Sequence, residues 1–428
     1  MKIGIDCRTI LNPGAGEQAG VGHYTYYLVK SLLALNQDNI YVLFFDDRFK
    51  NKKEFSAYNN VIIRTFPFYQ YKKYLPVTYS QMLVSALLGR EKLDVFHSPA
   101  NTLPLPYDGK SVVTVHDLAI YKYPEFFPGK FLNRQIFSTR VLVPRSLQKA
   151  DRIIAVSKNT KTDIIEEFSV PEDKISVVYE GVISHGKSCP NQADFAEVKK
   201  RYGISDNYFL FLGTIEPRKN IISLIKAFRN LKLIYDSPAK DYQLIIAGAK
   251  GWKDQPVYEA IADANASILG IKRRRSGLER RRGFDVRTDS QKKKMGERRS
   301  LDDRRKQDPI KYIGYVPHAD KLALLCRAVC FVFPTLYEGF GLPVLEAMSI
   351  GTPVITSNLS SLPEIVGSKS GLLIDPTKEA ELIDAMQHIL TDEGLRESLS
   401  ISGHERAQEF NWNDCAQKTL EVYQSLKK

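Results

Sequence analysis

Cysteine is scarce in this chain, and the cysteines that it has do not form a recognisable set. There are five among 428 residues, an odd number, and they are scattered along the sequence. None has the spacing of a zinc site or of a redox-active pair. Cys326 and Cys330, four residues apart, are therefore interpreted as core residues. This pattern argues against a disulfide scaffold or a zinc module and indicates reduced cysteines, as in the cytosol.

Long apolar stretches are also missing. No run approaches the roughly 20 apolar residues that a membrane-spanning helix needs. The first six residues have the pattern of a strand, and they lack the apolar stretch and the cleavage site of a signal peptide. Any membrane contact must then be peripheral, so we expect a cytoplasmic protein that can associate with the inner face of the membrane.

Acidic residues are fewer than basic residues, and most of the difference lies in one segment of the chain. The formal net charge is +12, and residues 271–309 hold 16 of the 61 Lys and Arg but only 7 of the 49 Asp and Glu, which places +9 of the excess there. With so little to bury, this segment is predicted to be a mobile surface insertion. An anionic membrane surface is a candidate accessory partner for it. Nucleic acid is a weaker candidate, because base stacking uses aromatic side chains and Phe284 is the only one present.

What the sequence does contain is a regular alternation of short β-branched or aromatic runs with helix-period segments such as 23–35 and 220–231. This alternation predicts an α/β protein in which parallel sheets are covered by helices on both faces. The expected strands of the first half are 2–6, 41–45, 61–64, 95–97, 112–116, 152–156 and 175–178, and those of the second half are 208–212, 243–247, 310–313, 329–333 and 353–356.

The pattern restarts near residue 208, which predicts two Rossmann-like domains. The first is placed at 1–184 and the second at 207–400, joined by a polar linker at 185–206. Residues 401–428 are predicted to form a helical tail. In a two-domain protein such a tail can cross back to the first domain.

The strongest chemical signal lies in residues 333–348, FPTLYEGFGLPVLEAM. An apolar strand is expected to end at the start of this segment, and Pro343 suits the first turn of the helix that should follow. The N-terminus of such a helix attracts phosphate, because its free N–H groups carry a partial positive charge. Gly339 and Gly341 allow a ligand to approach the backbone closely.

Two carboxylates, Glu338 and Glu346, flank this predicted phosphate site and suit the hydroxyls of a hexose and of a ribose. Their spacing resembles the E-x7-E signature of retaining glycosyltransferases, and the string Glu-Gly-Phe-Gly-Leu-Pro is similar to glycosyltransferase family 4. The resemblance implies the GT-B fold, with two Rossmann-like domains facing across a cleft: an acceptor domain at 1–184 and a domain that binds the nucleotide sugar at 207–400. It also implies that Glu338 is catalytic and that the donor is bound by Gly339, Phe340, Gly341, Leu342 and Glu346.

A second segment, GTIEPRKN at 213–220, follows the apolar run 208–212. It begins with Gly213 and brings Arg218 and Lys219 to the end of a predicted strand, where parallel sheets bind phosphate. The two cations can neutralise a diphosphate. The segment resembles the donor loop of the family, which implies that Gly213 contacts the donor and that the two cations stabilise the leaving nucleotide in place of a metal ion. Two solvated charges near a helix start are the alternative.

The same resemblance implies roles for residues in two further segments of the first half. His116 ends the run VVTVH, and it is implied to meet the donor sugar near the reacting carbon, whereas a hydrogen-bonded core histidine is the alternative. Asp117 is interpreted as fixing the loop or the ring of His116. In the glycine-rich loop 12–22, Gly20 and Gly22 are implied to lie near the donor phosphates, and surface flexibility is the alternative.

These observations predict a retaining, metal-independent hexosyltransferase that uses a nucleotide diphosphate sugar as substrate and needs no cofactor. The acceptor is expected to be a glycan or a lipid-linked molecule. GDP-mannose is preferred to UDP-glucose as the donor, because VGHY at 21–24 and HSP at 97–99 look most like bacterial mannosyltransferases. Other interpretations stay open: a nucleotide-sugar epimerase or a phosphorylase of the same fold, an NAD-dependent oxidoreductase, and a basic protein that binds nucleic acid or an anionic surface.

Overall fold

The computed structural model describes residues 1–11, 20–74, 77–128, 134–183, 189, 192–234, 236–270 and 308–427. The insertion expected at 271–309 therefore lies outside the described residues, apart from its last two. Most of the glycine-rich loop 12–22 lies outside them as well.

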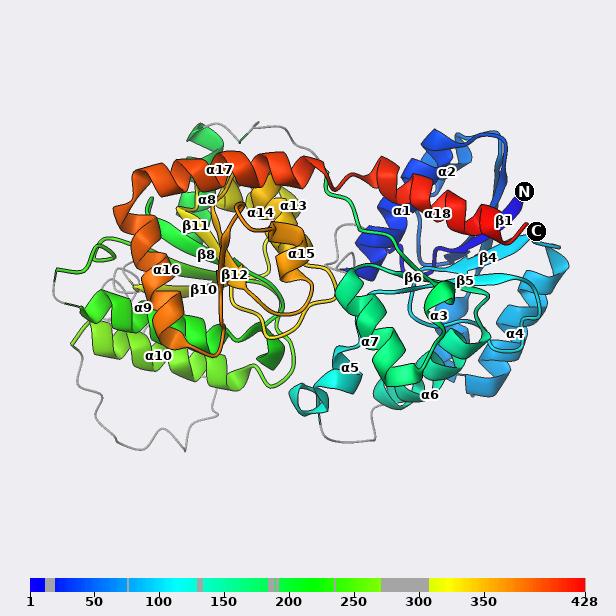
Figure 1. Ribbon diagram of the computed structural model, residues 1–428, viewed down its shortest axis with the longest axis horizontal. Coiled ribbons are helices and arrows are strands. Elements are labelled where there is room, and N and C mark those ends of the chain that lie inside the picture. Colours follow the sequence, from blue (N-terminus) through cyan, green and yellow to red (C-terminus); the bar gives the residue numbers. More distant parts are fainter. Residues whose placement is uncertain are drawn as a thin grey trace, which may run out of the picture.

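Two parallel sheets, one from each half of the chain, form the framework of the molecule (Figure 1). The first sheet has the order β3-β2-β1-β4-β5-β6-β7, with β1 at Lys2–Asp6, β2 at Ile40–Asp46, β3 at Val61–Phe66, β4 at Val95–Ser98, β5 at Ser111–Val115, β6 at Arg152–Ala155 and β7 at Ile175–Val177. The second has the order β10-β9-β8-β11-β12-β13, with β8 at Tyr208–Leu212, β9 at Gln243–Ala247, β10 at Ile310–Gly314, β11 at Cys330–Phe333, β12 at Val354–Ser357 and β13 at Leu372–Ile374. The predicted α/β fold class with two Rossmann-like sheets is confirmed.

The strands expected from the apolar runs are all present, and their ends shift by two residues at most. Every residue of β8 and β9 is buried, as expected for strands with helices on both faces. The strand β13 was not expected. It has only three residues, two of them partly exposed, so its apolar run is too short to stand out.

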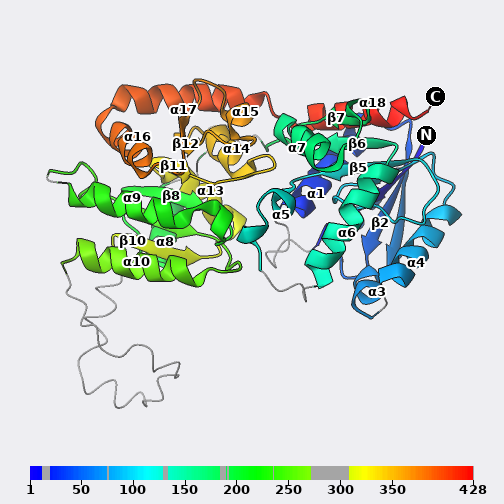
Figure 2. The same ribbon diagram turned by 60° about the horizontal axis from the view of Figure 1, so that its bottom comes forward.

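The side chains of the first sheet alternate between two apolar layers, as the period of a strand requires. Tyr41, Leu43 and Phe45 of β2 point into one layer, which contains helix α1 (Val21–Leu35) and helix α18 (Trp412–Ser425). Val42 and Phe44 point into the other layer, with helices α4 (Val77–Arg90) and α6 (Arg134–Lys149). Figure 2 shows these helices on opposite sides of the sheet.

The end of the chain returns to the first domain. Helix α17 (Glu393–Gln408) packs on α14 (Leu342–Ser349) of the second domain, whereas α18 packs along α1 and the first sheet (Figure 1). There the hydroxyl of Tyr423 lies 2.6 Å from Nδ1 of the buried His97. The two segments that connect the domains also touch, since Val182 N–H donates to the Phe410 carbonyl over 3.0 Å. The chain therefore passes between the domains twice at one place.

The cysteines require a correction. Cys189 and Cys326 form a disulfide between segments 137 residues apart in the sequence, so the interpretation that all cysteines are reduced is wrong for this pair. Cys326 lies on α13 (His318–Arg327) and is only partly buried, whereas Cys330 lies in the core as expected. Among the described residues, no helix is both long and apolar enough to cross a membrane.

Candidate active site

The loop between β11 and α14 lies against the first domain. Gly341 adopts a positive φ of 118° just before α14, and Pro343 occupies the first turn of that helix. A Cβ atom on Gly339 would lie 1.6 Å from the carbonyl oxygen of His116, at the end of β5. Since only glycine permits so close an approach, the two domains meet here through backbone.

The start of helix α7 (Lys158–Phe168) holds this loop in place. The hydroxyls of Ser157 and Thr160 lie 2.7 Å and 3.1 Å from the carbonyl oxygen of Gly339. Tyr337, two residues before that glycine, donates its hydroxyl to Asp163 over 2.7 Å. Contacts from the first domain therefore set the position of the residue that lies between them, Glu338.

Glu338 belongs to a cluster of four charged side chains, Glu216, Arg218, Lys219 and Glu338, which we call the ionic cluster. Lys219 donates from Nζ to Oε1 of Glu338, and Arg218 Nη1 donates to Oε2 over 3.2 Å. Arg218 also donates from Nε to Glu216 over 2.8 Å. Glu216, Lys219 and Glu338 are each less than 10% exposed. The sequence segments 213–220 and 333–348 thus contribute to one site at the ends of the neighbouring strands β8 and β11.

The charged groups of the ionic cluster shift one another's pKa values. Burial alone would raise the pKa of Glu338, but Arg218 and Lys219 hold it below its usual value. Burial also lowers the pKa of Lys219, and the neighbouring Arg218 acts in the same direction. Two cations face two carboxylates in a buried place, and Arg218 pairs with both carboxylates, so an incoming anion can reorganise the site.

Sequence analysis missed Glu216. Its Oε1 accepts from Arg218, whereas its Oε2 is buried and has no hydrogen-bond partner among the described residues. Burial raises the pKa of this carboxyl, against the opposing effect of Arg218 and Lys219. The residue stands inside the segment GTIEPRKN, two positions before Arg218. Its place in that segment is the signal that could have identified it.

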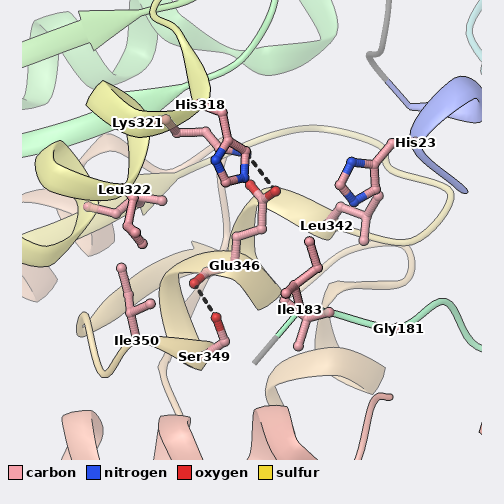
Figure 3. A pocket seen from close by; sticks show the side chains of 12 residues that line it. His23, Gly181, Ile183, His318, Lys321, Leu322, Leu342, Glu346, Ser349 and Ile350 are labelled. Carbon is pink, nitrogen blue, oxygen red and sulfur yellow. Dashed lines mark hydrogen bonds and ion pairs between the residues drawn. The ribbon is translucent and has the colours of Figure 1, made fainter. Parts of the chain in front are cut away.

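Glu346 lines a pocket whose lining does not include Glu338. It lies on α14 and forms an ion pair of 2.6 Å with Lys321 on α13, and both line a pocket together with His23, Gly181, His318 and Leu342 (Figure 3). Burial alone would raise the pKa of Glu346, but Lys321 holds it below its usual value. Because His23 belongs to α1 of the first domain, this pocket spans both domains. The predicted carboxylate pair is therefore divided between the ionic cluster and this pocket.

His116 has partners within the first domain for both ring nitrogens. Nδ1 lies 3.1 Å from Glu180, and Nε2 lies 2.9 Å from the carbonyl oxygen of Pro99. The ring also contacts Tyr24 edge to face. Burial would lower the pKa of His116, but the hydrogen bond and the charge of Glu180 raise it. This geometry favours a positively charged imidazole beside the loop that carries Gly339.

The other residues that were predicted to bind the donor lie in several different parts of the fold. Gly20 has a φ of 60° and precedes α1, in which Gly22 is buried. Gly213 directly follows β8, and its N–H donates to the Ala247 carbonyl over 3.0 Å. The side chain of Phe340 is buried between Tyr179 and Phe410. Leu342 lines the pocket of Glu346.

In the first turn of α14, Gly341 provides no capping side chain, Pro343 has no N–H, and the N–H groups of Val344 and Leu345 donate to the Gly341 carbonyl, which leaves the N–H of Leu342 as the donor directed toward the loop. Together with Arg218 and Lys219, this helix start forms a cationic end of the second sheet, suited to a phosphate group. Within the described part of the chain, no group of three or more His, Cys, Asp or Glu side chains has the arrangement of a metal site.

Comparison with known proteins agrees with this geometry. The model of the group 1 glycosyl transferases matches residues 194–406, and that of glycosyltransferase family 4 matches residues 19–184. The chain is 29% identical over 421 residues to the O-antigen chain mannosyltransferase B of Escherichia coli, covering 95% of this chain and 96% of that protein. It is 27% identical to the O-antigen chain mannosyltransferase RfbU of Salmonella typhimurium, covering 68% and 63%. Its fold resembles Anabaena HepE in complex with UDP and glucose, with a TM-score of 0.66, 17% identity and coverage of 99% and 100%.

Proposed function

Because this chain belongs to glycosyltransferase family 4, has the GT-B fold and is a hexosyltransferase, we propose that it transfers mannose from GDP-mannose to a glycan, with retention of the anomeric configuration and without a metal ion. The observation that carries this proposal is the buried ionic cluster at the ends of β8 and β11. Its cations suit a diphosphate, and its carboxylate suits the hydroxyls of a sugar.

Donor binding must rearrange the ionic cluster. Arg218 and Lys219 are both paired with Glu338 in the structure, and a diphosphate would compete with that carboxylate for them. Glu338 then becomes available to accept hydrogen bonds from the sugar. The negative charge that develops on the leaving diphosphate is met by the two cations and by the start of α14. Charge stabilisation of this kind is preorganised electrostatic catalysis.

Retention is proposed to follow a dissociative course. The bond between the anomeric carbon and the phosphate oxygen breaks first, and an oxocarbenium-like centre forms. The acceptor hydroxyl then attacks from the face that the diphosphate leaves, and its proton passes to the departing phosphate oxygen. Glu216 and Glu338 are both bound to Arg218, so they do not face each other across a sugar as the two carboxylates of a retaining glycosidase do.

Mannose is preferred as the transferred sugar because two relatives that match this chain bear the name O-antigen chain mannosyltransferase. The same names support a growing surface glycan, free or lipid-linked, as the acceptor. UDP-glucose is the competing donor, since the HepE structure holds UDP and glucose. A cytoplasmic enzyme at the inner face of the membrane would fit such an acceptor.

An accessory contact between residues 271–309 and an anionic membrane surface is part of this proposal. The structure makes its deletion practical, because the side-chain amide of Asn265, near the end of α10 (Gln255–Ile268), donates to the carbonyl and accepts the N–H of Ile310 at the start of β10. A short linker can therefore join the flanks. We expect the deletion variant to lose binding to vesicles that contain anionic phospholipid and to keep transfer to a soluble acceptor. Unchanged vesicle binding would contradict this part.

Thermal unfolding with a panel of nucleotide sugars tests the donor. A ligand at 100 times its Kd stabilises the folded state by about 2.7 kcal/mol, and GDP-mannose should raise the melting temperature more than UDP-glucose does. Transfer to a mannoside acceptor is then followed in the presence of EDTA, with ¹H NMR of the product anomer. Release of free sugar without acceptor, loss of activity in EDTA, or an inverted product would each refute the corresponding part of the proposal.

A further inference from the structure

Arg218 binds carboxylates from two different loops of the ionic cluster. Its Nε donates to Glu216 on its own loop over 2.8 Å. Its Nη1 donates to Glu338 over 3.2 Å and to the carbonyl of Tyr337 over 3.0 Å, and both of these lie on the loop between β11 and α14. Among the described residues, no group accepts a hydrogen bond from Nη2. The guanidinium is therefore held through Nε by Glu216 and through Nη1 by the second loop.

The two carboxylate contacts have different fates in the proposed reaction. A diphosphate that displaces Glu338 takes its place at Nη1, and Nη2 beside it completes the fork that arginine offers to phosphate oxygens. The hydrogen bond to Glu216 uses the third nitrogen, Nε, so it does not compete with the phosphate. Glu216 is thus the carboxylate that Arg218 keeps while the donor is bound.

The backbone on both sides of Glu216 is fixed. Before it, Ile215 is fully buried, and its N–H donates to the Ala249 carbonyl over 3.0 Å. After it, the carbonyl of Arg218 accepts the N–H of Leu336 over 2.8 Å. The side chain of Glu216 itself is only 3% exposed. A carboxylate on so constrained a backbone provides a rigid support for the guanidinium of Arg218.

Folding alone does not explain a carboxylate at this position. Oε2 of Glu216 is buried and has no hydrogen-bond partner within the described ranges, which is unfavourable for a carboxylate oxygen. Two roles remain, a counter-charge for the two cations or an anchor that directs Arg218. A counter-charge requires the negative charge, whereas an anchor requires only an acceptor oxygen at the correct distance. Burial raises the pKa of Glu216 and so disfavours its charged form, which favours the anchor.

We propose that Glu216 is a positioning residue for sugar transfer. It holds Nε of Arg218, so that the two terminal nitrogens stay directed at the diphosphate after Glu338 has been displaced. The inference rests on the proposed function. Electrostatic catalysis depends on donors that already point to the place where charge develops, and an Arg218 that turned freely would stabilise the leaving diphosphate less. Glu216 acts through Arg218 and needs no contact with the sugar.

Two conservative substitutions separate the anchor from the counter-charge. Glu216→Gln keeps an acceptor oxygen at the same distance but removes the charge, whereas Glu216→Asp keeps the charge but draws it back by one CH₂ group. We expect Glu216→Gln to retain most of the wild-type kcat and Glu216→Asp to lower it at least about tenfold, the equivalent of about 1.4 kcal/mol. The loss should appear in kcat rather than in the KM for the donor, because it concerns charge that develops in the transition state.

A double-mutant cycle tests whether Glu216 acts through Arg218. In the Arg218→Ala background, Glu216→Asp should change the remaining kcat by less than about twofold, because no guanidinium is left to position. The donor is the radiolabelled nucleotide sugar that raises the melting temperature most, and long incubations keep the slow variants measurable. Far-UV circular dichroism verifies that each variant is folded, and the shift in melting temperature with that nucleotide sugar verifies that the donor still binds.

Glu91→Asp is the matched control. Glu91 also accepts from Nε of an arginine, Arg64, but it belongs to the first domain. It also accepts from Lys2 beside the N-terminus, which Figure 1 shows at the end of the first domain that is far from the second domain. Shortening this glutamate should therefore leave the kcat of transfer unchanged.

Three results would overturn the inference. They are a Glu216→Asp variant with the kcat of the wild type, a Glu216→Gln variant as slow as Glu216→Asp, and an equal loss of kcat from Glu216→Asp with and without Arg218. Sugar transfer by the wild type would leave the proposed function standing in each case. A wild type that transfers no sugar, and whose melting temperature no nucleotide sugar raises, would instead count against the proposed function itself.

Discussion

The contact between Gly339 and His116 provides the sharpest test of how the two domains form one site. In Gly339→Ala, the new Cβ would lie 1.6 Å from the His116 carbonyl oxygen, whereas a comfortable C···O contact is roughly 3.3 Å. Both partners are main chain, so neither can rotate away. The loop and the first domain must then separate by more than an ångström.

The separation would weaken the hydrogen bonds that the Gly339 carbonyl accepts from Ser157 and Thr160. Each is worth about 0.5–1.5 kcal/mol, so we expect a loss of about 1–3 kcal/mol and a melting temperature lower by a few degrees. Because Glu338 is the adjacent residue, a displacement of this size should also reduce kcat by roughly 10². Thermal unfolding and initial rates of sugar transfer measure the two effects separately.

Gly89→Ala serves as the matched control. A Cβ atom at this position of α4 meets no atom within 4 Å, so alanine should leave the rate of transfer unchanged and stabilise the helix by about 0.5–1 kcal/mol. A Gly339→Ala variant with the kcat and the melting temperature of the wild type would refute the domain contact. A lower melting temperature with unchanged kcat would refute its link to catalysis.

Three further predictions follow from other parts of the structure. Arg218→Ala should lower the kcat of transfer by about 10²–10³ while far-UV circular dichroism stays that of the folded protein, and near wild-type turnover would exclude its proposed role. The raised pKa of His116 means that its pairing with Glu180 stabilises the protein fully below the unfolded value, near pH 6.5, and that this stability is lost as the pH rises through the folded pKa. The difference in unfolding free energy between wild type and Glu180→Gln should therefore shrink with rising pH, and a constant difference in urea titrations would contradict it. Reduction of the disulfide between Cys189 and Cys326 should destabilise the protein by about 2–5 kcal/mol, so dithiothreitol should lower the melting temperature of the wild type but not of Cys189→Ser.

The sheets could be predicted from sequence because buried parallel strands are continuous apolar runs. Tyr208–Leu212 is such a run and was placed to the residue. The three residues of Leu372–Ile374 give no comparable signal, since a run so short is common in loops and helices as well. A strand that is buried on both faces can thus be predicted from the sequence, whereas a short edge strand cannot.

The candidate site was predictable to the extent that its residues stand in compact segments. Glu338, Arg218 and Lys219 each follow a buried strand, and the order of the strands brings them together. The place of Glu346 in a pocket with Lys321 was not predictable, because Lys321 comes from a different segment of the chain and is brought to Glu346 by tertiary structure. The pairing of Cys189 likewise depends on tertiary structure alone.

The return of the chain to its first sheet fixes the order in which the protein can be completed. Cys415, Leu420 and Tyr423 of α18 are buried in the same apolar layer as Ile3 and Ile5 of β1. A nascent chain therefore exposes that layer until the whole second domain has been translated, although the sheet beneath it was made first. Domains that fold as independent units during synthesis do not carry this dependence. The first domain is therefore the first to be synthesised, but its apolar layer is the last to be completed.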